Sequence, residues 1–294
     1  MPLPLNSCLV AAGLLLTLAC GPGAPPAATQ ANPAAQPASK AAKATPPTTA
    51  PPPVASRDAS PTTPEPAGPT YAEAGGMMYL EQIIGEAGPD EPLPMLVAIH
   101  GLGDRPEAFA RVLSAFPEPV RLILPRGIDA YEGGWSWFPQ RARSRDVEAL
   151  GGGIQHAADV IATGLTALAA ERPTKGKPVL TGFSQGGMLT FAIAVSHPDV
   201  VGYAVPVSGW LPPPLWPENG DTAAVTPKIV ALHGTTDSAV LYEGTVEAVD
   251  QLKTLGYAAE LRTFEGVPHA IPPIVLRAWT DLLKDAVIRA KRSQ

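Results

Sequence analysis

From Tyr71 onward, short apolar runs alternate with segments in which apolar residues recur at a helical period of roughly 3.6 residues. The short runs are typical of strands buried on both faces, and the periodic segments are typical of helices that bury one side. Strands and helices that alternate in this way form parallel sheets. The pattern therefore predicts an α/β fold with a mostly parallel central sheet and helices on both faces.

The individual elements follow from the same pattern. Strands are expected at residues 77–84, 95–99, 120–124, 178–181, 201–207, 228–232 and 259–264. Helices are expected at residues 106–116, 154–170, 188–195, 242–255 and 273–290. Residues 131–150 are rich in Trp, Gly and Arg and show no clear period, so no element is predicted there.

The first 70 residues differ in character from this domain. Residues 9–19 form an apolar run of signal-peptide length, too short for a comfortable membrane-spanning helix. It ends in Thr17-Leu18-Ala19-Cys20-Gly21, which resembles the cleavage box of bacterial lipoproteins, with Cys20 as the residue that receives the lipid. Residues 1–20 are therefore predicted to be a signal peptide, and the protein to be exported and anchored to a membrane through Cys20. One alternative is an ordinary signal peptide cut near Ala19 or Ala24, which would leave a periplasmic or secreted protein, and the other is that the protein is not exported.

Residues 21–70 are predicted to be a disordered tether. More than half of them are Pro or Ala. Such a segment buries too little apolar surface to offset the entropy lost on ordering. Three parts are thus expected: a signal peptide at 1–20, a tether at 21–70, and one α/β domain at 71–294.

Composition excludes several functions for this domain. The 294-residue chain has a formal net charge of -6, which argues against nucleic-acid binding through a basic face. Its two cysteines, Cys8 and Cys20, both precede the domain. The domain therefore contains neither a disulfide nor a cysteine-based metal site, and no metal is expected.

The stretch Gly182-Phe183-Ser184-Gln185-Gly186 matches G-x-S-x-G, the nucleophile elbow of α/β-hydrolases. In an elbow, a strand turns sharply into a helix with the serine at the strained tip, and glycines permit the close backbone approach. A predicted strand precedes the motif and a predicted helix follows it. Ser184 is therefore the candidate nucleophile.

A serine nucleophile needs a base and an acid that orients the base. In this fold they follow the serine in the order acid, then His, each after a strand. Asp237 follows the strand at 228–232, and His269 follows the strand at 259–264. A turn-forming role is the alternative for Asp237. The other histidines, at positions 100, 156, 197 and 233, are expected to have structural or surface roles.

The negative charge that develops on the substrate oxygen requires preorganised donors. One is the backbone N–H of the residue after the nucleophile, Gln185. The other is expected from the loop after the strand at 95–99, at Leu102, where Gly101 and Gly103 allow a close approach.

With these residues in place, residues 71–290 resemble the carboxylesterase/phospholipase family of α/β-hydrolases, which includes the acyl-protein thioesterases. Four stretches carry the resemblance: His100-Gly101-Leu102-Gly103-Asp104, Gly182-Phe183-Ser184-Gln185-Gly186-Gly187, Ser208-Gly209-Trp210-Leu211-Pro212 and His233-Gly234-Thr235-Thr236-Asp237. The resemblance implies esterase or thioesterase activity without metal or organic cofactor.

An acyl pocket is expected beside the nucleophile. Its candidate walls are Trp135, Trp137, Trp210 and Leu211, for which core packing is the alternative role. Three arginines between residues 141 and 145 indicate a basic rim.

These patterns favour a serine carboxylic-ester or thioester hydrolase that forms an acyl-enzyme and acts on a small or lipid-like ester. A peptidase or polymer depolymerase on the same fold is one alternative. A non-catalytic, surface-anchored binding module is the other.

Overall fold

The computed structural model describes residues 69–218 and 226–292. The predicted signal peptide, with Cys20, lies outside the described residues, as does the predicted tether apart from residues 69 and 70. Among the helices that are described, none is both long enough and apolar enough to cross a membrane.

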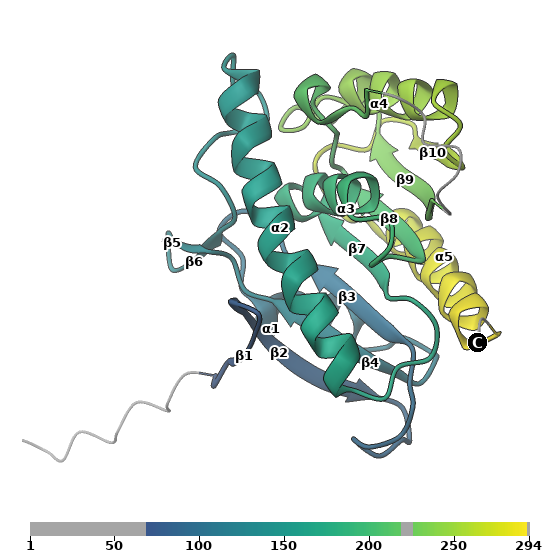
Figure 1. The fold of residues 1–294 in the computed structure, drawn as a ribbon. Helices are drawn as coiled ribbons and strands as arrows, with labels where there is room; N and C mark the ends of the chain where they lie inside the picture. The colour runs from purple at the N-terminus through teal and green to yellow at the C-terminus, as the bar shows by residue number, and fades with distance from the viewer. Residues whose placement is uncertain (1–68, 219–225, 293–294) are drawn as a thin grey trace, which may run out of the picture. The chain divides into compact units, whose positions relative to one another are not determined.

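The domain is built on an eight-stranded sheet, shown in Figure 1. The strands, in spatial order, are β1 (Ala72–Ala74), β2 (Met77–Ile84), β4 (Val120–Pro125), β3 (Met95–Ile99), β7 (Val179–Phe183), β8 (Tyr203–Val207), β9 (Lys228–Gly234) and β10 (Ala259–Phe264). In this order, neighbouring strands from β4 to β10 run parallel. Strand β2 is antiparallel to both of its neighbours, β1 and β4. A separate hairpin consists of β5 (Asp129–Tyr131) and β6 (Gly134–Ser136).

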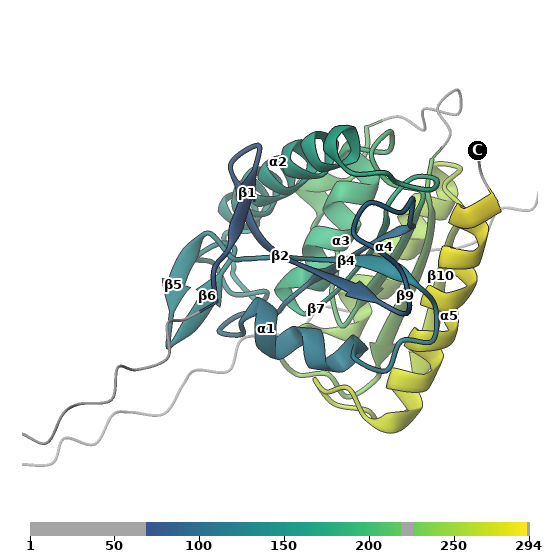
Figure 2. The ribbon, with the colours of Figure 1, turned by 90° about the horizontal axis from the view of Figure 1, so that it is seen from below.

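Helices cover both faces of the sheet. They are α1 (Pro106–Phe109), α2 (Val147–Glu171), α3 (Gln185–Ser196), α4 (Tyr242–Thr254) and α5 (Pro273–Arg292), with 3₁₀ turns at Ala110–Leu113 and Pro213–Leu215. Figure 2 shows α2, α3 and α4 on one side of the sheet and α1 and α5 on the other. The predicted α/β-hydrolase architecture is confirmed.

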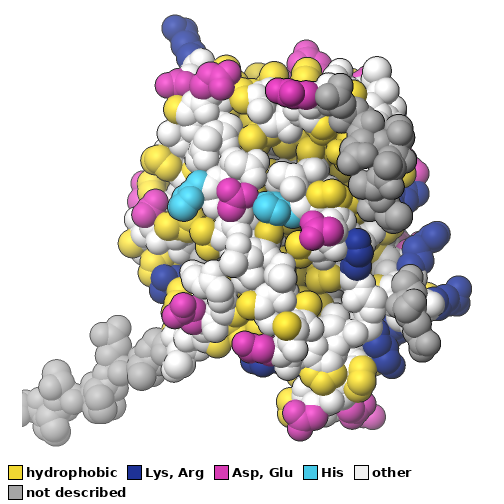
Figure 3. Space-filling model, in the orientation of Figure 1, with side chains coloured by type: hydrophobic (Ala, Val, Ile, Leu, Met, Phe, Trp, Pro, Cys, Tyr) yellow, Lys and Arg dark blue, Asp and Glu magenta, His cyan; other side chains and the backbone are white. Residues whose placement is uncertain are grey.

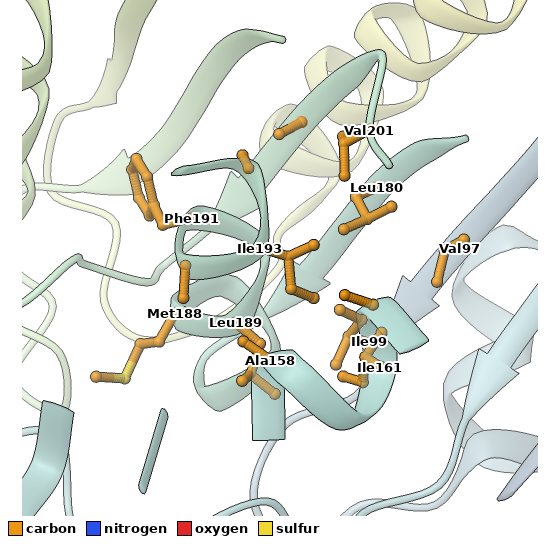
Figure 4. Close-up of a cluster of buried hydrophobic side chains, with 14 of the residues drawn as sticks. Val97, Ile99, Ala158, Ile161, Leu180, Met188, Leu189, Phe191, Ile193 and Val201 are labelled. Carbon is orange, nitrogen blue, oxygen red and sulfur yellow. The ribbon is translucent and has the colours of Figure 1, made fainter. Parts of the chain in front are cut away.

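Alternate residues of each central strand enter different cores. Val97 and Ile99 of β3 face α2 and α3, whereas Leu96 and Ala98 face α1 and α5. Figure 4 shows the first of these cores, where residues from β3 and β7 meet apolar side chains of α2 and α3. Burial on both faces explains the uninterrupted apolar run of β3, because a strand covered on one side alone would alternate.

The outer surface of the helices is mixed. On the face seen in Figure 3, charged and histidine side chains stand among apolar and other atoms. The apolar surface on this face is therefore broken into small areas, as expected when each helix buries its apolar stripe against the sheet.

Two helices differ most from their predicted bounds. The helix expected at 106–116 ends at Phe109 and continues as a 3₁₀ turn to Leu113. The tighter turns place Leu113 and Phe116 in the core, and Pro117 cannot continue a helix. The helix expected at 154–170 begins earlier, at Val147.

The early start of α2 has a local cause. The Asp146 side chain caps the helix by accepting a hydrogen bond from the Ala149 N–H at 2.9 Å. Three glycines at positions 151–153 interrupt the apolar period over the same turns. The three-residue strands β1, β5 and β6 were also not predicted, because they are too short to show a pattern.

Close backbone packing at the start of α3 gives the first testable prediction. A Cβ added to Gly186 would overlap the carbonyl oxygen of Ile99, whereas a Cβ on Gly152 of α2 would meet open space. Gly186→Ala should lower the free energy of unfolding by about 1–3 kcal/mol, as overpacking does. Gly152→Ala should raise it by up to about 1 kcal/mol, because alanine favours helix over glycine.

Urea unfolding of the two variants and the wild type measures both effects. Equal shifts for Gly186→Ala and Gly152→Ala would contradict the packing argument.

Candidate active site

The candidate site residues meet at the carboxyl ends of four parallel strands. Leu102 follows β3, Ser184 follows β7, Asp237 follows β9 and His269 follows β10. Parallel strands end at the same edge of a sheet, which is where open α/β folds bind their ligands. These four residues, which are distant in sequence, therefore lie at one edge of the sheet.

Ser184 has a strained backbone. Its φ of 58° and ψ of -118° lie outside the regions that residues with a side chain normally adopt. Such a conformation costs on the order of 1–3 kcal/mol and persists only where its surroundings hold it. Here the Ser184 N–H donates to Val207 O at 3.0 Å, and Ser184 O accepts from the Met188 N–H at 3.0 Å.

The three predicted triad residues form a continuous hydrogen-bond chain. His269 Nδ1 lies 2.7 Å from Asp237 Oδ2, and His269 Nε2 lies 3.0 Å from Ser184 Oγ. A carboxylate only accepts, so Nδ1 carries a hydrogen and donates it. In neutral His269, Nε2 is then free to accept the hydroxyl hydrogen of Ser184, the geometry that a general base needs.

The Asp237 side chain is fully buried and saturated with donors. Its Oδ1 accepts from the N–H groups of Ala239 and Val240 at 3.0 and 2.9 Å. Burial acts to raise the pKa of this carboxyl. Hydrogen bonds from His233, His269 and Val240, together with the attraction of His269, outweigh burial and hold the pKa of Asp237 well below its usual range.

A second histidine, His233, is fully buried and supports the acid. His233 Nε2 lies 3.0 Å from Val240 O and 3.3 Å from Asp237 Oδ2, and Nδ1 lies 2.8 Å from Thr245 Oγ1. Since a carbonyl and a carboxylate are both acceptors, Nε2 must carry a hydrogen. The structural role expected for His233 is therefore specific: it fixes the loop that carries Asp237.

The loops of the acid and the base are joined directly. The N–H of Thr235 donates to Phe264 O and the N–H of Thr236 to Val267 O, at 3.0 and 3.2 Å. The N–H of Gly266 donates to Thr235 Oγ1 at 2.9 Å. These bonds hold the two loops together, so the short distance between Asp237 and His269 does not depend on one side-chain contact.

The predicted oxyanion residues border the nucleophile. Gln185 is the first residue of α3, so its backbone N–H is among those that have no partner within the helix. The loop with Leu102 lies against the elbow, since a Cβ on Gly101 would sit 3.4 Å from Ser184 Cβ. Its conformation is fixed by a hydrogen bond from the Gly103 N–H to Trp135 O at 2.8 Å.

The Gln185 side chain has a separate, structural function. Its Oε1 accepts from the Trp137 N–H at 3.1 Å, and its Nε2 donates to Phe138 O at 3.0 Å. The side chain therefore fastens the segment after β6 to the elbow.

His100 is held beneath the oxyanion loop. Its Nε2 accepts from the Gly127 N–H at 3.1 Å, so Nδ1 carries the hydrogen and donates to Gly101 O at 2.7 Å. Burial lowers the pKa of this fully buried imidazole, which disfavours its charged form. Both ring nitrogens are thus occupied, consistent with the role of stiffening this loop.

A cavity of about 220 Å³ opens beside Ser184. Its lining residues are Leu102, Gln140, Arg141, Ala142, Arg143, Ser184, Gln185, Met188, Ala239 and Val240. Arg141 and Arg143 give it the basic rim expected from the sequence.

The residues expected to wall an acyl pocket do not line this cavity. Trp137 and Leu211 are corrections: both are buried in the core, at 2% and 0% exposure. The Trp137 indole N–H donates to His100 O at 2.9 Å, which satisfies its polar atom inside the protein. Trp135 lies against the Arg126 guanidinium, 4.0 Å from its ring centroid, and Trp210 lines an adjacent cavity.

Sequence reasoning missed several residues of the site. The Phe183 ring packs against the His269 ring with centroids 4.7 Å apart, and Met188 and Val240 line the cavity. The G-x-S-x-G motif accepts any residue at the position of Phe183, so the motif gave no reason to select this side chain.

In the part of the chain that the structure describes, no group of three or more His, Cys, Asp or Glu side chains is placed to hold a metal ion.

Residues 81–286 match the Phospholipase/Carboxylesterase family. The chain belongs to this family. The family is one of carboxylesterase- and thioesterase-type hydrolases.

Individual relatives are more distant. Carboxylesterase SOBER1 of Arabidopsis thaliana is 35% identical over 94 residues, which cover 31% of this chain and 41% of that protein. The chain thus matches less than half the length of this relative.

Two crystal structures illustrate the shared fold. Esterase PE8 has a TM-score of 0.60 at 21% identity, over 71% of this chain and 99% of the other. Acyl-protein thioesterase 2 of Zea mays has a TM-score of 0.54 at 23% identity, with the same coverage.

The lowered pKa of Asp237 predicts a dependence of stability on pH. Its pKa is lower in the folded than in the unfolded chain, where it is about 3.9, so ionised Asp237 stabilises the folded protein above that pH. This contribution is lost as the pH falls toward the folded value. The unfolding free energy of the wild type should therefore fall more steeply between about pH 5 and pH 2 than that of Asp237→Asn.

Urea unfolding across this pH range tests the prediction, with Asp285→Asn, an exposed position on α5, as the control for loss of one carboxylate. Parallel pH curves for the wild type and Asp237→Asn would contradict it.

Proposed function

We propose that the protein is a serine carboxylic-ester or thioester hydrolase that acts through an acyl-enzyme. One observation carries this proposal: the hydrogen-bond chain from Asp237 through His269 to the hydroxyl of the strained Ser184. Membership of the Phospholipase/Carboxylesterase family supports the reaction class.

In the first half of the reaction, Ser184 Oγ attacks the acyl carbonyl carbon while His269 Nε2 takes its proton. The negative charge moves to the carbonyl oxygen, which the N–H groups of Leu102 and Gln185 stabilise. Asp237 keeps Nδ1 of His269 protonated and stabilises the imidazolium. As the tetrahedral intermediate collapses, the bond to the alcohol or thiol breaks, and His269 gives its proton to that leaving group.

In the second half, water replaces the leaving group. His269 takes a proton from the water, whose oxygen attacks the acyl carbon and forms a second tetrahedral intermediate. The bond to Ser184 Oγ then breaks, the proton returns to Ser184, and the carboxylic acid leaves. Apart from the substrate and this water, both halves use only groups of the chain.

The alternatives have less support. A non-catalytic binding module has no need for a serine at a φ of 58°, a strain that is retained at functional sites. The match to the Phospholipase/Carboxylesterase family favours an ester over a peptide as the substrate.

Removal of the nucleophile is the direct test. Ser184→Ala should lower kcat/KM for p-nitrophenyl esters by roughly 10⁴-fold or more, because members of a triad act as a unit. A series of acyl chains from acetate to octanoate, followed by release of nitrophenolate, gives both the activity and the chain-length preference.

The matched control is Ser114→Ala, at an exposed serine remote from the triad in sequence, which should keep wild-type rates. A fluorophosphonate probe should label the wild type and Ser114→Ala but leave Ser184→Ala unlabelled. An inactive wild type, or an equally active Ser184→Ala, would refute the mechanism.

For localisation, we infer that the protein is exported and attached to a membrane by a lipid on Cys20, with residues 21–70 as the tether. The apolar run at 9–19 and the cleavage box around Cys20 support this proposal. An exported enzyme would meet esters outside the cytoplasm, on small molecules or lipids.

Lipid attachment can be tested in a bacterial host fed radiolabelled palmitate. The full chain should incorporate label and sediment with membranes, and Cys20→Ala should do neither. Cys8→Ala, within the segment that is removed, is the matched control and should behave as the wild type does. Retention of label by Cys20→Ala would exclude Cys20 as the attachment site.

A further inference from the structure

The cavity beside Ser184 has an unbalanced charge. Two of its lining side chains, Arg141 and Arg143, are cationic, and no aspartate or glutamate lines it. Neither arginine lies within ion-pair distance of a carboxylate in residues 69–218 and 226–292. A chain with net charge -6 thus presents positive charge next to its nucleophile.

Each arginine is held in place by an uncharged group. The Arg141 guanidinium lies over the Tyr131 ring, 5.2 Å from the centroid, and donates to the Tyr131 hydroxyl. Arg143 donates to Ser238 O at 3.2 Å, which ties its loop to the residue after Asp237. These contacts restrict the side chains without neutralising them, so part of the ordering entropy is lost before a ligand binds.

The neighbouring cavities differ in charge. Arg141 also borders a cavity that contains Asp129, and Arg143 borders one that contains Glu243 and Glu247. Carboxylates in these outer cavities repel an anion, whereas the cavity at Ser184 has none. An anionic group is therefore favoured next to the reacting ester rather than farther along the surface.

We propose that Arg141 and Arg143 select substrates that carry a carboxylate or a phosphate close to the scissile ester. This inference rests on the proposed hydrolase function and narrows its substrate class. Guanidinium groups bind both anions with paired N–H donors, and the anion stays charged at neutral pH. Since both arginines line the same cavity as Ser184, the anion is expected a few bonds from the acyl carbon.

The test compares esters that differ in one charged group. Mono-4-nitrophenyl glutarate and 4-nitrophenyl pentanoate differ in a carboxylate that replaces a methyl group at the end of the acyl chain. The leaving-group pair is 4-acetoxybenzoate and 4-acetoxybenzamide, and 4-acetoxyphenyl phosphate replaces the carboxylate by phosphate. Spontaneous hydrolysis is subtracted from each rate.

For the wild type at low salt, kcat/KM for the anionic member of at least one pair should exceed that for the neutral member by about fivefold or more. A partly exposed ion pair gives an effect of this order. The acyl and leaving-group pairs show which part of the substrate carries the anion, and the phosphate ester shows whether phosphate substitutes for carboxylate. About 0.5 M NaCl should reduce the preference by screening.

Variants locate the source of the preference. Arg141→Gln and Arg143→Gln should each lower the anionic-to-neutral ratio about threefold or more. Arg145→Gln is the matched control: it removes the same charge from the same loop, but Arg145 lines none of these three cavities, and the ratio should stay at the wild-type value.

The outcomes separate this inference from the function on which it rests. No turnover of any ester, neutral or anionic, by the wild type would refute the proposed hydrolase. Turnover of neutral esters with no anionic preference in any pair would refute only the role of the arginines. An equal fall of the ratio in Arg145→Gln would also refute it, because the effect would then come from overall charge.

Discussion

The site depends on how closely backbones pass one another at the nucleophile elbow. Gly186 lies against the carbonyl of Ile99, and Gly187 lies against Gly209 after the next strand, with no room for a Cβ at any of these glycines. This packing fixes α3 directly above the ends of β3, β7 and β8. Because both ends of the turn are held, Ser184 retains a backbone conformation that an isolated peptide would avoid. The strained backbone of Ser184 is thus maintained by tertiary contacts and not by the motif alone.

The catalytic partners are positioned by the sheet and then fixed by polar contacts. Adjacent parallel strands bring the loops after β9 and β10 together, but a sheet edge alone does not orient an imidazole. Orientation comes from the Asp237 carboxylate, each oxygen of which has its own donors, and from His233 behind it. In a buried setting, such a network is rigid only when every member is satisfied, and here both oxygens of the acid are.

The sequence predicted much of this arrangement because the motifs carry their own geometry. The positions of Ser184, Asp237 and His269 followed from a short pattern, a fixed chain order and the ends of apolar strands. The residues that line the cavity could not be predicted in the same way, because an aromatic residue can equally well be buried in the core or form the wall of a pocket. Trp137 looked like a pocket residue, yet its N–H found a carbonyl inside the protein. The cavity is instead lined by residues 140–143, from a segment whose lack of period gave no basis for placing side chains.

That segment has two fixed ends. At one end, the Gln185 side chain holds Trp137 and Phe138 to the elbow, and at the other, Asp146 caps α2. Between them, residues 140–143 line the cavity beside Ser184 but supply none of the triad. Substitutions in this segment can therefore change the shape and charge of the cavity, whereas the triad residues come from other loops and keep their positions.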